Sequence, residues 1–212
     1  MGVIKRGILG GFSNKVANVV GSSWKGIAYM RAMPLSVANP RTAGQVNQRT
    51  RFGTISAFAS GIVGGWIQPL WNRFAVQASG FNDFVRVNID YVANNGIIAY
   101  ADLKMSSGKL INVTNIAIVG AITAGNSGSD IEWVDNTGQG NALATDDVYA
   151  VGYNVGQDKW STVGVEQRDE SSVRVNFEDP YESGDVVYFW IATRRADGTI
   201  VSNSFDVTGT AA

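Results

Sequence analysis

The sequence predicts an α+β fold in which an N-terminal β-hairpin arm and a short helical unit precede a β-sandwich. Three patterns carry this prediction: β-branched and aromatic residues over 1–38, helical spacing of apolar residues over about 40–93, and short alternating segments from residue 110 onward. A hydrophobic fraction of 45% is sufficient for a core. We therefore divide the chain into a basic N-terminal region, 1–109, and an acidic sandwich, 110–212.

The first predicted element is a β-hairpin over 12–33, with the segments KVANVV and SSWKGIAYMRAM as strands and a turn at 21–23. Two sets of side chains would alternate along the second strand: Trp24, Gly26, Ala28 and Met30 on one face, and Lys25, Ile27, Tyr29, Arg31 and Met33 on the other. Neither set is cleanly polar, so we expect both faces to be covered, by the rest of the fold or by another subunit. An internal strand whose two cations extend along apolar surface is an equally weighted alternative.

A helical unit is predicted to begin at Asn39-Pro40, with asparagine as the cap and proline at the first helical position. Over 40–62 an apolar stripe is formed by Phe52, Ile55, Ala59 and Ile62. On another side, a cationic ridge is formed by residues spaced four apart, namely Arg41, Gln45 and Arg49. Further helices are expected at about 66–78 and 80–93 with their aromatic residues in a core, and a strand is expected over 97–105.

From residue 110 the pattern becomes that of short strands separated by turn residues: NIAIVGAI, DIEWV, DVYAVGYNV, SSVRVNF, DVVYFWIATRR and TIVSNSFDV. The Asp197-Gly198 pair predicts a hairpin turn between the last two. The alternation in SSVRVNF points Val173, Val175 and Phe177 inward, whereas VVYFWIAT is apolar on both faces and reads as a central strand. This spacing of strands is typical of an immunoglobulin-like sandwich.

The same C-terminal part resembles a fibronectin type III domain. The likeness rests on Trp133 in an early strand and on VVYFWIATRRADGTIVSNSFDV, which is similar to the last hairpin of that family. The resemblance implies a fold and not a function.

The whole chain resembles a family of uncharacterised proteins of Bacteroidetes bacteria and their phages. The residues that carry this likeness are GGFSNKVANVVGSSWKGIAYMR, SVANPRTAGQVNQRTRF and WVDNTGQGNALATDDVYAVGYN. Members of that family usually have glycine where this chain has Asn14 and Ala17, which implies a first hairpin that differs in detail. The family has no assigned activity, and its occurrence in phages favours a role in a virion or an assembly.

The composition excludes several kinds of enzyme chemistry. The chain has no His and no Cys, so it has no Ser-His-Asp triad, Cys nucleophile or thiolate metal site. A phosphate-binding P-loop fails because Leu110 follows Gly108-Lys109. We expect no catalysis, cofactor or resident metal. In the acidic loop 135–147 calcium stays an open question, although a turn with side-chain hydrogen bonds is favoured over a calcium loop.

Charge is distributed unevenly along the chain. Residues 1–82 hold nine Lys or Arg and no Asp or Glu, whereas residues 110–212 hold five basic and fifteen acidic residues. Such asymmetry predicts two ends with different partners. Copies could associate head to tail through their opposite ends, which gives rings or filaments.

Our leading hypothesis is therefore a non-enzymatic structural subunit of a phage virion or a related bacterial assembly, which forms a homo-oligomer through its basic N-terminal half. Other virion proteins are further candidate partners. The expected contact residues are Trp24, Lys25, Tyr29, Arg31, Arg41, Gln45 and Arg49. We expect synthesis in the cytoplasm and a final place in the virion if a phage encodes the chain. No membrane partner is expected, because the sequence has no apolar run of about 18 residues.

Two alternatives belong to other functional classes. The nine N-terminal cations could neutralise phosphates of a nucleic acid while Trp24 and Tyr29 stack on its bases. The loops of the sandwich could instead recognise a glycan or a protein, for which Trp160 is the only local indication.

Overall fold

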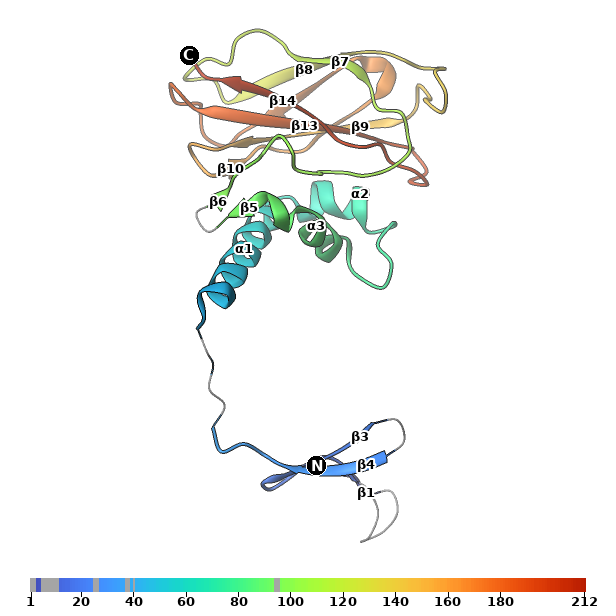
Figure 1. The fold of residues 1–212 in the computed structure, drawn as a ribbon. Helices are drawn as coiled ribbons and strands as arrows, with labels where there is room; N and C mark the ends of the chain where they lie inside the picture. The colour runs from blue at the N-terminus through green and yellow to red at the C-terminus, as the bar shows by residue number, and fades with distance from the viewer. Residues whose placement is uncertain (1–2, 5–11, 25–26, 37–38, 40, 94–95) are drawn as a thin grey trace. The chain divides into compact units, whose positions relative to one another are not determined.

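A computed structural model describes residues 3–4, 12–24, 27–36, 39, 41–93 and 96–212 of the chain (Figure 1). The chain forms two compact units, Met1–Thr42, here called the arm, and Ala43–Ala212, here called the body. The helices therefore belong to the same unit as the C-terminal sheets, whereas the sequence analysis placed them with the arm. Helices and antiparallel sheets together give an α+β fold.

The arm is an antiparallel sheet with the order β1-β2-β3-β4. Its strands are β1 (Val3–Ile4), β2 (Phe12–Val16), β3 (Val19–Trp24) and β4 (Ile27–Ala32). The arm is β-structured as predicted, but the strand bounds and the turn predicted at 21–23 are wrong: KVANVV is divided between β2 and β3, and SSWKGIAYMRAM between β3 and β4. Residues 21–23 lie inside β3, and β2 joins β3 through Ala17-Asn18, where Ala17 takes a left-handed φ of 50°. The valines on each side of this two-residue turn, Val16 and Val19, pair directly and set the register.

The first helix of the body, α1, runs from Ala43 to Ser60. The predicted start at Asn39 is wrong, because helical structure begins only after Thr42, which is itself a residue type favoured at the N-cap. The buried residues of α1 all lie in its C-terminal half. A stripe with helical spacing is buried there and continues just past the helix end: Ile55, Phe58, Ala59 and Ile62. Phe52 was predicted in this stripe but is 54% exposed, because the buried positions of α1 begin only at Ile55, three residues further on.

The other helical elements are short. After a π-turn at Val63–Ile67 come α2 (Gln68–Trp71), α3 (Gly80–Asn88) and a 3-10 turn at Ile89–Tyr91. The Ser79 side chain caps α3 by accepting a hydrogen bond from the backbone N–H of Asn82. The single helix predicted over 66–78 is thus shorter than expected, whereas the one predicted over 80–93 ends in the short hairpin of β5 (Val92–Ala93) and β6 (Gly96–Ile97).

The strand predicted over 97–105 does not form beyond Ile97. The chain instead runs irregularly and buries Leu103 and Met105 against the helices. The indole N–H groups of Trp66 and Trp71 both donate to the Met105 carbonyl oxygen, at 2.9 and 2.7 Å. This carbonyl is satisfied by side chains rather than by a sheet partner, which removes the need for strand pairing at this position.

Two antiparallel sheets form the rest of the body. The larger sheet has the order β10 (Lys159–Trp160), β9 (Asp147–Asn154), β13 (Val186–Arg194), β14 (Phe205–Thr210), and β11 (Gly164–Gln167) also pairs with β9. The smaller sheet has the order β12 (Ser172–Asn176), β8 (Gly128–Val134), β7 (Thr114–Ile118). A 3-10 turn, η3 (Arg168–Glu170), joins β11 to β12.

Strand β13 explains how the body is layered. Its residues Val187, Phe189 and Ile191 belong to the core shared with the smaller sheet, and Trp190 and Ala192 belong to the core shared with the helices. The body is therefore built of a helical layer, the larger sheet and the smaller sheet, in that order (Figure 1). The prediction that VVYFWIAT is a central strand apolar on both faces is confirmed, since β13 lies between β9 and β14.

Within the part of the chain that is described, no helix combines the length and apolar character needed to cross a membrane.

Candidate assembly interface

Strand β4 of the arm is exposed along its whole length. Ile27 and Met30 point to opposite faces of the strand, and their side chains are 67% and 68% exposed. Val16 and Val19, next to the β2–β3 turn, are also large apolar residues that stay exposed. An isolated sheet that covers neither of its faces is marginal in water. The arm therefore presents apolar surface that its own residues do not bury.

The register of the arm groups its side chains into two faces. Ile27, Tyr29 and Arg31 alternate along one face of β4, and their partners across the strand are Trp24, Ser22 and Val20. The sequence analysis placed Trp24 and Tyr29 in one strand, which is wrong, because Trp24 ends β3, where it pairs with Ile27, and Tyr29 lies in β4. The other face of β4 carries Ala28, Met30 and Ala32.

One long edge of the arm sheet is available for pairing. Among the described strands, β4 pairs only with β3, so its other side is a sheet edge. Met33 N–H donates to the Asn18 carbonyl oxygen at 2.7 Å, which makes this pair hydrogen-bonded. Since bonded and non-bonded pairs alternate, Ala28, Met30 and Ala32 direct their N–H and C=O groups away from β3. An exposed edge of this kind is a template for another strand.

The charges of the two units are opposite in sign. The arm holds six Lys or Arg and no Asp or Glu, whereas the body holds eleven Lys or Arg and eighteen Asp or Glu. The formal charges are thus +6 and −7. The predicted basic half extended to residue 82, but two of its cations belong to the body and donate hydrogen bonds to carbonyl oxygens there. Arg51 donates to the carbonyl oxygens of Val92 and Ile89, both at 2.6 Å, and Arg73 donates to the Asp197 carbonyl oxygen at 3.1 Å.

The predicted contact residues fall on both units. Tyr29 and Arg31 share one exposed face of β4, and Arg41 is an exposed residue of the arm. Gln45 and Arg49 are exposed on α1, in the body, so the predicted ridge with Arg41 is not continuous helix. The Lys25 prediction lies outside the described residues, and of Trp24 the structure describes the backbone only.

Sequence reasoning missed the apolar contact candidates. Ile27 and Met30 were assigned to strand faces but not to an interface, and Phe52 was assigned to a helical core. Val46 is likewise exposed, on the N-terminal half of α1. A helical stripe that begins late in a helix cannot be distinguished by spacing from one that begins at its start. The sequence therefore did not indicate that the residues of α1 before Ile55 are largely exposed.

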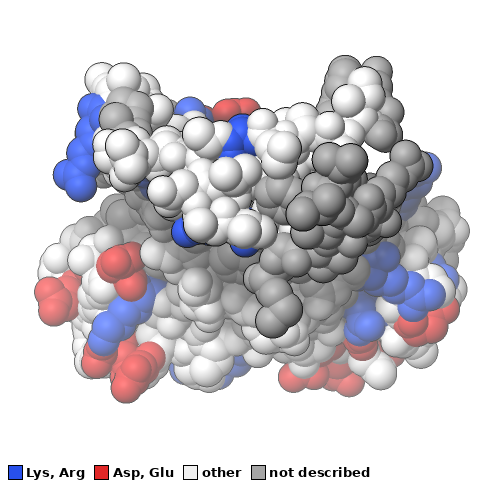
Figure 2. Space-filling view, turned by 90° about the horizontal axis from the view of Figure 1, so that it is seen from below, with Lys and Arg blue, Asp and Glu red and all other residues white. Residues whose placement is uncertain are grey.

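Cations do not gather densely on the face drawn in Figure 2. On the face drawn in Figure 2, Lys and Arg side chains lie as separate groups among uncharged residues, and several stand next to Asp or Glu. Among the exposed pairs in the body are Arg174 with Asp130, at 2.7 Å, and Lys159 with Asp179. Such mixed charge is typical of a solvated protein surface rather than of a continuous track for phosphates.

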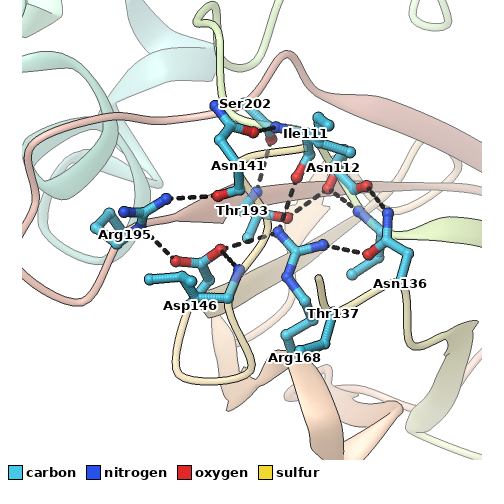
Figure 3. A network of polar contacts seen from close by, with 12 residues as sticks. Ile111, Asn112, Asn136, Thr137, Asn141, Asp146, Arg168, Thr193, Arg195 and Ser202 are labelled. Atoms are coloured by element: carbon cyan, nitrogen blue, oxygen red, sulfur yellow. Dashed lines mark hydrogen bonds and ion pairs between the residues drawn. The ribbon is translucent and has the colours of Figure 1, made fainter. Parts of the chain in front are cut away.

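The acidic loop 135–147 is organised around a protein cation (Figure 3). The side chains of Arg168 and Asp146 are both 0% exposed, and Arg168 Nη2 lies 3.2 Å from Asp146 Oδ2. Arg168 also donates to Asn136 Oδ1 and, at 2.8 Å, to the Ile111 carbonyl oxygen. Arg195 Nε lies 2.7 Å from the second oxygen of Asp146. The Asp146 carboxylate in this loop thus lies beside two guanidinium groups of the protein itself.

The electrostatics of this cluster follow from its burial. Removal from water lowers the pKa of Arg168, and the adjacent Asp146 carboxylate opposes that shift. Asp135, at the exposed start of the loop, accepts hydrogen bonds from the Thr137 hydroxyl and backbone N–H, which lower its pKa. This is the turn with side-chain hydrogen bonds that the sequence favoured. Among the described residues no group of three or more acidic side chains is arranged to hold a metal ion.

The features above define a class of protein: a helix-covered pair of antiparallel sheets that carries an exposed, cationic β arm. The chain belongs to a family of unknown function, DUF6266, whose model matches residues 11–208. That match covers parts of both the arm and the body. Comparisons with curated proteins and with solved structures give no match.

Proposed function

We propose that this protein is a non-enzymatic structural subunit that self-associates through its arm. The observation that carries the proposal is strand β4, which is exposed on both faces and has an edge along which another strand can pair. Burying a side chain such as Ile27 or Met30 contributes about 1.5–3 kcal/mol, whereas association costs about 4–15 kcal/mol. Several of the exposed apolar residues of the arm must therefore be buried together for a stable contact.

The opposite charges of the two units supply a direction for this association. An arm of charge +6 on one copy is attracted to a body of charge −7 on another, and a head-to-tail contact of this kind can repeat. The predicted residues Tyr29 and Arg31 lie on one face of β4 beside Ile27, so a single face offers both cationic and apolar contacts. We place this assembly in a phage particle or a related bacterial structure, in keeping with the family resemblance of the sequence.

We further propose that the two facing sheets of the body form a fibronectin type III-like module. The first, second and fifth long strands, β7, β8 and β12, make one sheet, and the third, sixth and seventh, β9, β13 and β14, belong to the other. This interleaving matches the A, B, E and C, F, G strands of immunoglobulin-like sandwiches. Tyr181 is buried just before β13, where such folds place a corner tyrosine, and its hydroxyl pairs with the Ser129 hydroxyl at 2.9 Å.

Sedimentation velocity of the full chain over a range of concentrations tests self-association. The wild type is expected to form oligomers that weaken as salt is raised, because the charge attraction is screened. Met30→Ser removes an exposed apolar side chain from β4 without changing the charge of the arm, and it is expected to weaken association by at least about tenfold. Leu143→Ser is the matched control, since Leu143 is a 45% exposed apolar residue of the body and the change leaves the charge of the body unaltered. A wild type that remains monomeric at every concentration and salt would refute the proposal.

Nucleic-acid binding is the second candidate, and the absence of Asp and Glu from the arm favours it. Filter binding of single-stranded DNA at several salt concentrations decides between the two functions. A steep linear fall of log affinity with log salt would support this candidate. Lack of retention at low salt, together with salt-sensitive oligomers, would leave self-association as the function of the arm.

A further inference from the structure

A cavity of about 540 Å³ lies in the body between α1, the segment that follows β6 and the β9–β10 hairpin. Four aromatic side chains line it, Phe58, Tyr100, Tyr153 and Trp160. Among the described residues that line it, the only charged one is Asp158. The cavity is therefore an aromatic pocket with a single carboxylate.

The aromatic walls are held in place by their own packing. The ring centroids of Phe58 and Trp160 are 4.4 Å apart, those of Tyr153 and Trp160 are 4.8 Å apart, and those of Tyr100 and Tyr153 are 5.6 Å apart. The Trp160 indole N–H donates to the Phe58 carbonyl oxygen at 3.0 Å, which anchors β10 to α1. At Gly61 an added Cβ would come within 2.2 Å of Trp160 Cδ1, so the indole lies directly on the helix. The pocket is thus largely preformed.

The carboxylate of Asp158 has no cationic partner among the described residues. The Tyr153 hydroxyl donates to Asp158 Oδ1, whereas the adjacent Lys159 pairs with Asp179. Burial, and next the hydrogen bond to Asp158, raise the pKa of Tyr153, so this hydroxyl remains a donor at neutral pH. Asp158 is an exposed residue of the β9–β10 turn, so its carboxylate, held by the Tyr153 hydroxyl beside the aromatic rings, is accessible to a cation from outside the chain.

We propose that this pocket binds the cationic head group of a ligand, a guanidinium or a methylated ammonium group. Aromatic rings attract such cations through their negative faces, and the effect grows when the site excludes water. Asp158 adds the full negative charge that completes the site. The cation has two sources, an Arg or Lys side chain from the arm of a second copy or a free small molecule. The inference goes beyond self-association, because a free cation would bind without any assembly.

The experiment is a titration of the full chain with methylguanidinium chloride, followed by NMR through the indole N–H signal of Trp160. That signal is assigned by its loss in Trp160→Phe. Methylurea has the same shape without the charge, and sodium chloride at equal concentration controls for ionic strength. Saturable shifts with methylguanidinium, and none with the two controls, are the expected result.

Variants of single acidic residues locate the binding. Asp158→Asn keeps a hydrogen-bond acceptor for Tyr153 but removes the charge, and it is expected to weaken binding at least about tenfold. Asp169→Asn is the matched control, because Asp169 is an exposed acid in η3 outside the cavity lining. It is expected to leave the affinity for methylguanidinium unchanged.

Sedimentation of the same samples distinguishes the two sources. If an arm of a second copy supplies the cation, saturating methylguanidinium dissociates the oligomers and Asp158→Asn weakens them. If the source is a free molecule, the probe binds and the oligomers are unaffected. The pocket proposal is overturned by the absence of a saturable shift, by equal binding of methylurea, or by full affinity in Asp158→Asn. Failure of self-association alone leaves the titration result unaffected, so the two proposals fail separately.

Discussion

Replacing Arg168 by methionine removes the central cation of the buried cluster. The change deprives Asp146 Oδ2, Asn136 Oδ1 and the Ile111 carbonyl oxygen of their donor. The side chains of Arg168 and Asp146 are both 0% exposed, so solvent does not replace the lost guanidinium. Arg168→Met is therefore expected to destabilise the body severely.

The magnitude follows from what remains around Asp146. Removing one partner of a buried ion pair costs about 3–5 kcal/mol, because the other charge stays buried. Here Arg195 still lies 2.7 Å from the second carboxylate oxygen, and the Leu143 N–H still donates at 2.8 Å. These contacts place the expected loss at the lower end, about 3 kcal/mol, which corresponds to a shift of about 1–2 M in the urea midpoint.

Urea unfolding monitored by near-ultraviolet circular dichroism measures this loss. Arg174→Met serves as the control, since Arg174 and Asp130 form a 2.7 Å pair in which the side chains are 56% and 46% exposed. An exposed pair contributes about 0–1 kcal/mol, so the control should lose no more than that. A loss below about 1 kcal/mol in Arg168→Met would show that the cluster does not bear on stability as we argue.

Four further predictions concern other parts of the chain. Ala17→Gly should raise hydrogen-exchange protection in the arm by about 1 kcal/mol, because Ala17 has φ 50°. Gly152→Ala should lower the thermal midpoint, since the new Cβ would lie 2.8 Å from two aromatic rings. Burial raises the pKa of Asp206, so its cost to stability grows as pH rises through that pKa, and Asp206→Asn should stabilise the protein to urea at pH 7 but not near pH 3. The Thr199 hydroxyl and N–H lower the pKa of Asp197, so Asp197→Asn should destabilise at pH 7, with the difference lost in acid.

Features set by neighbouring residues could be predicted from the sequence. The Asp197-Gly198 turn forms where expected, with Gly198 at φ 70° and the Gly198 N–H bonded to the Arg195 carbonyl oxygen. Val173 and Val175 are buried as their alternation predicts. In β13 the lack of a polar face correctly indicated that layers cover both sides, although the sequence could not tell that one of these layers is helical.

Features set by distant contacts could not be predicted. The irregular course around Met105 depends on two indole groups more than thirty residues earlier in the chain. Arg168 and Asp146 meet because Gln167 pairs with Asp147 at the ends of β11 and β9, a register that no spacing rule predicts. In the arm, the turn at Ala17-Asn18 lacks glycine, whereas the glycine- and serine-rich stretch 21–23 continues as strand. Strand pairing on both sides of 21–23 therefore outweighed its turn propensity.

The central claim is that the edge of β4 pairs with a second copy. Amide hydrogen exchange of the full chain, measured at low and high protein concentration, tests it most directly. Ala28, Met30 and Ala32 direct their N–H groups outward from the sheet, so we predict that these three amides become protected as concentration rises. Exchange at these amides that stays fast and independent of concentration would contradict the account.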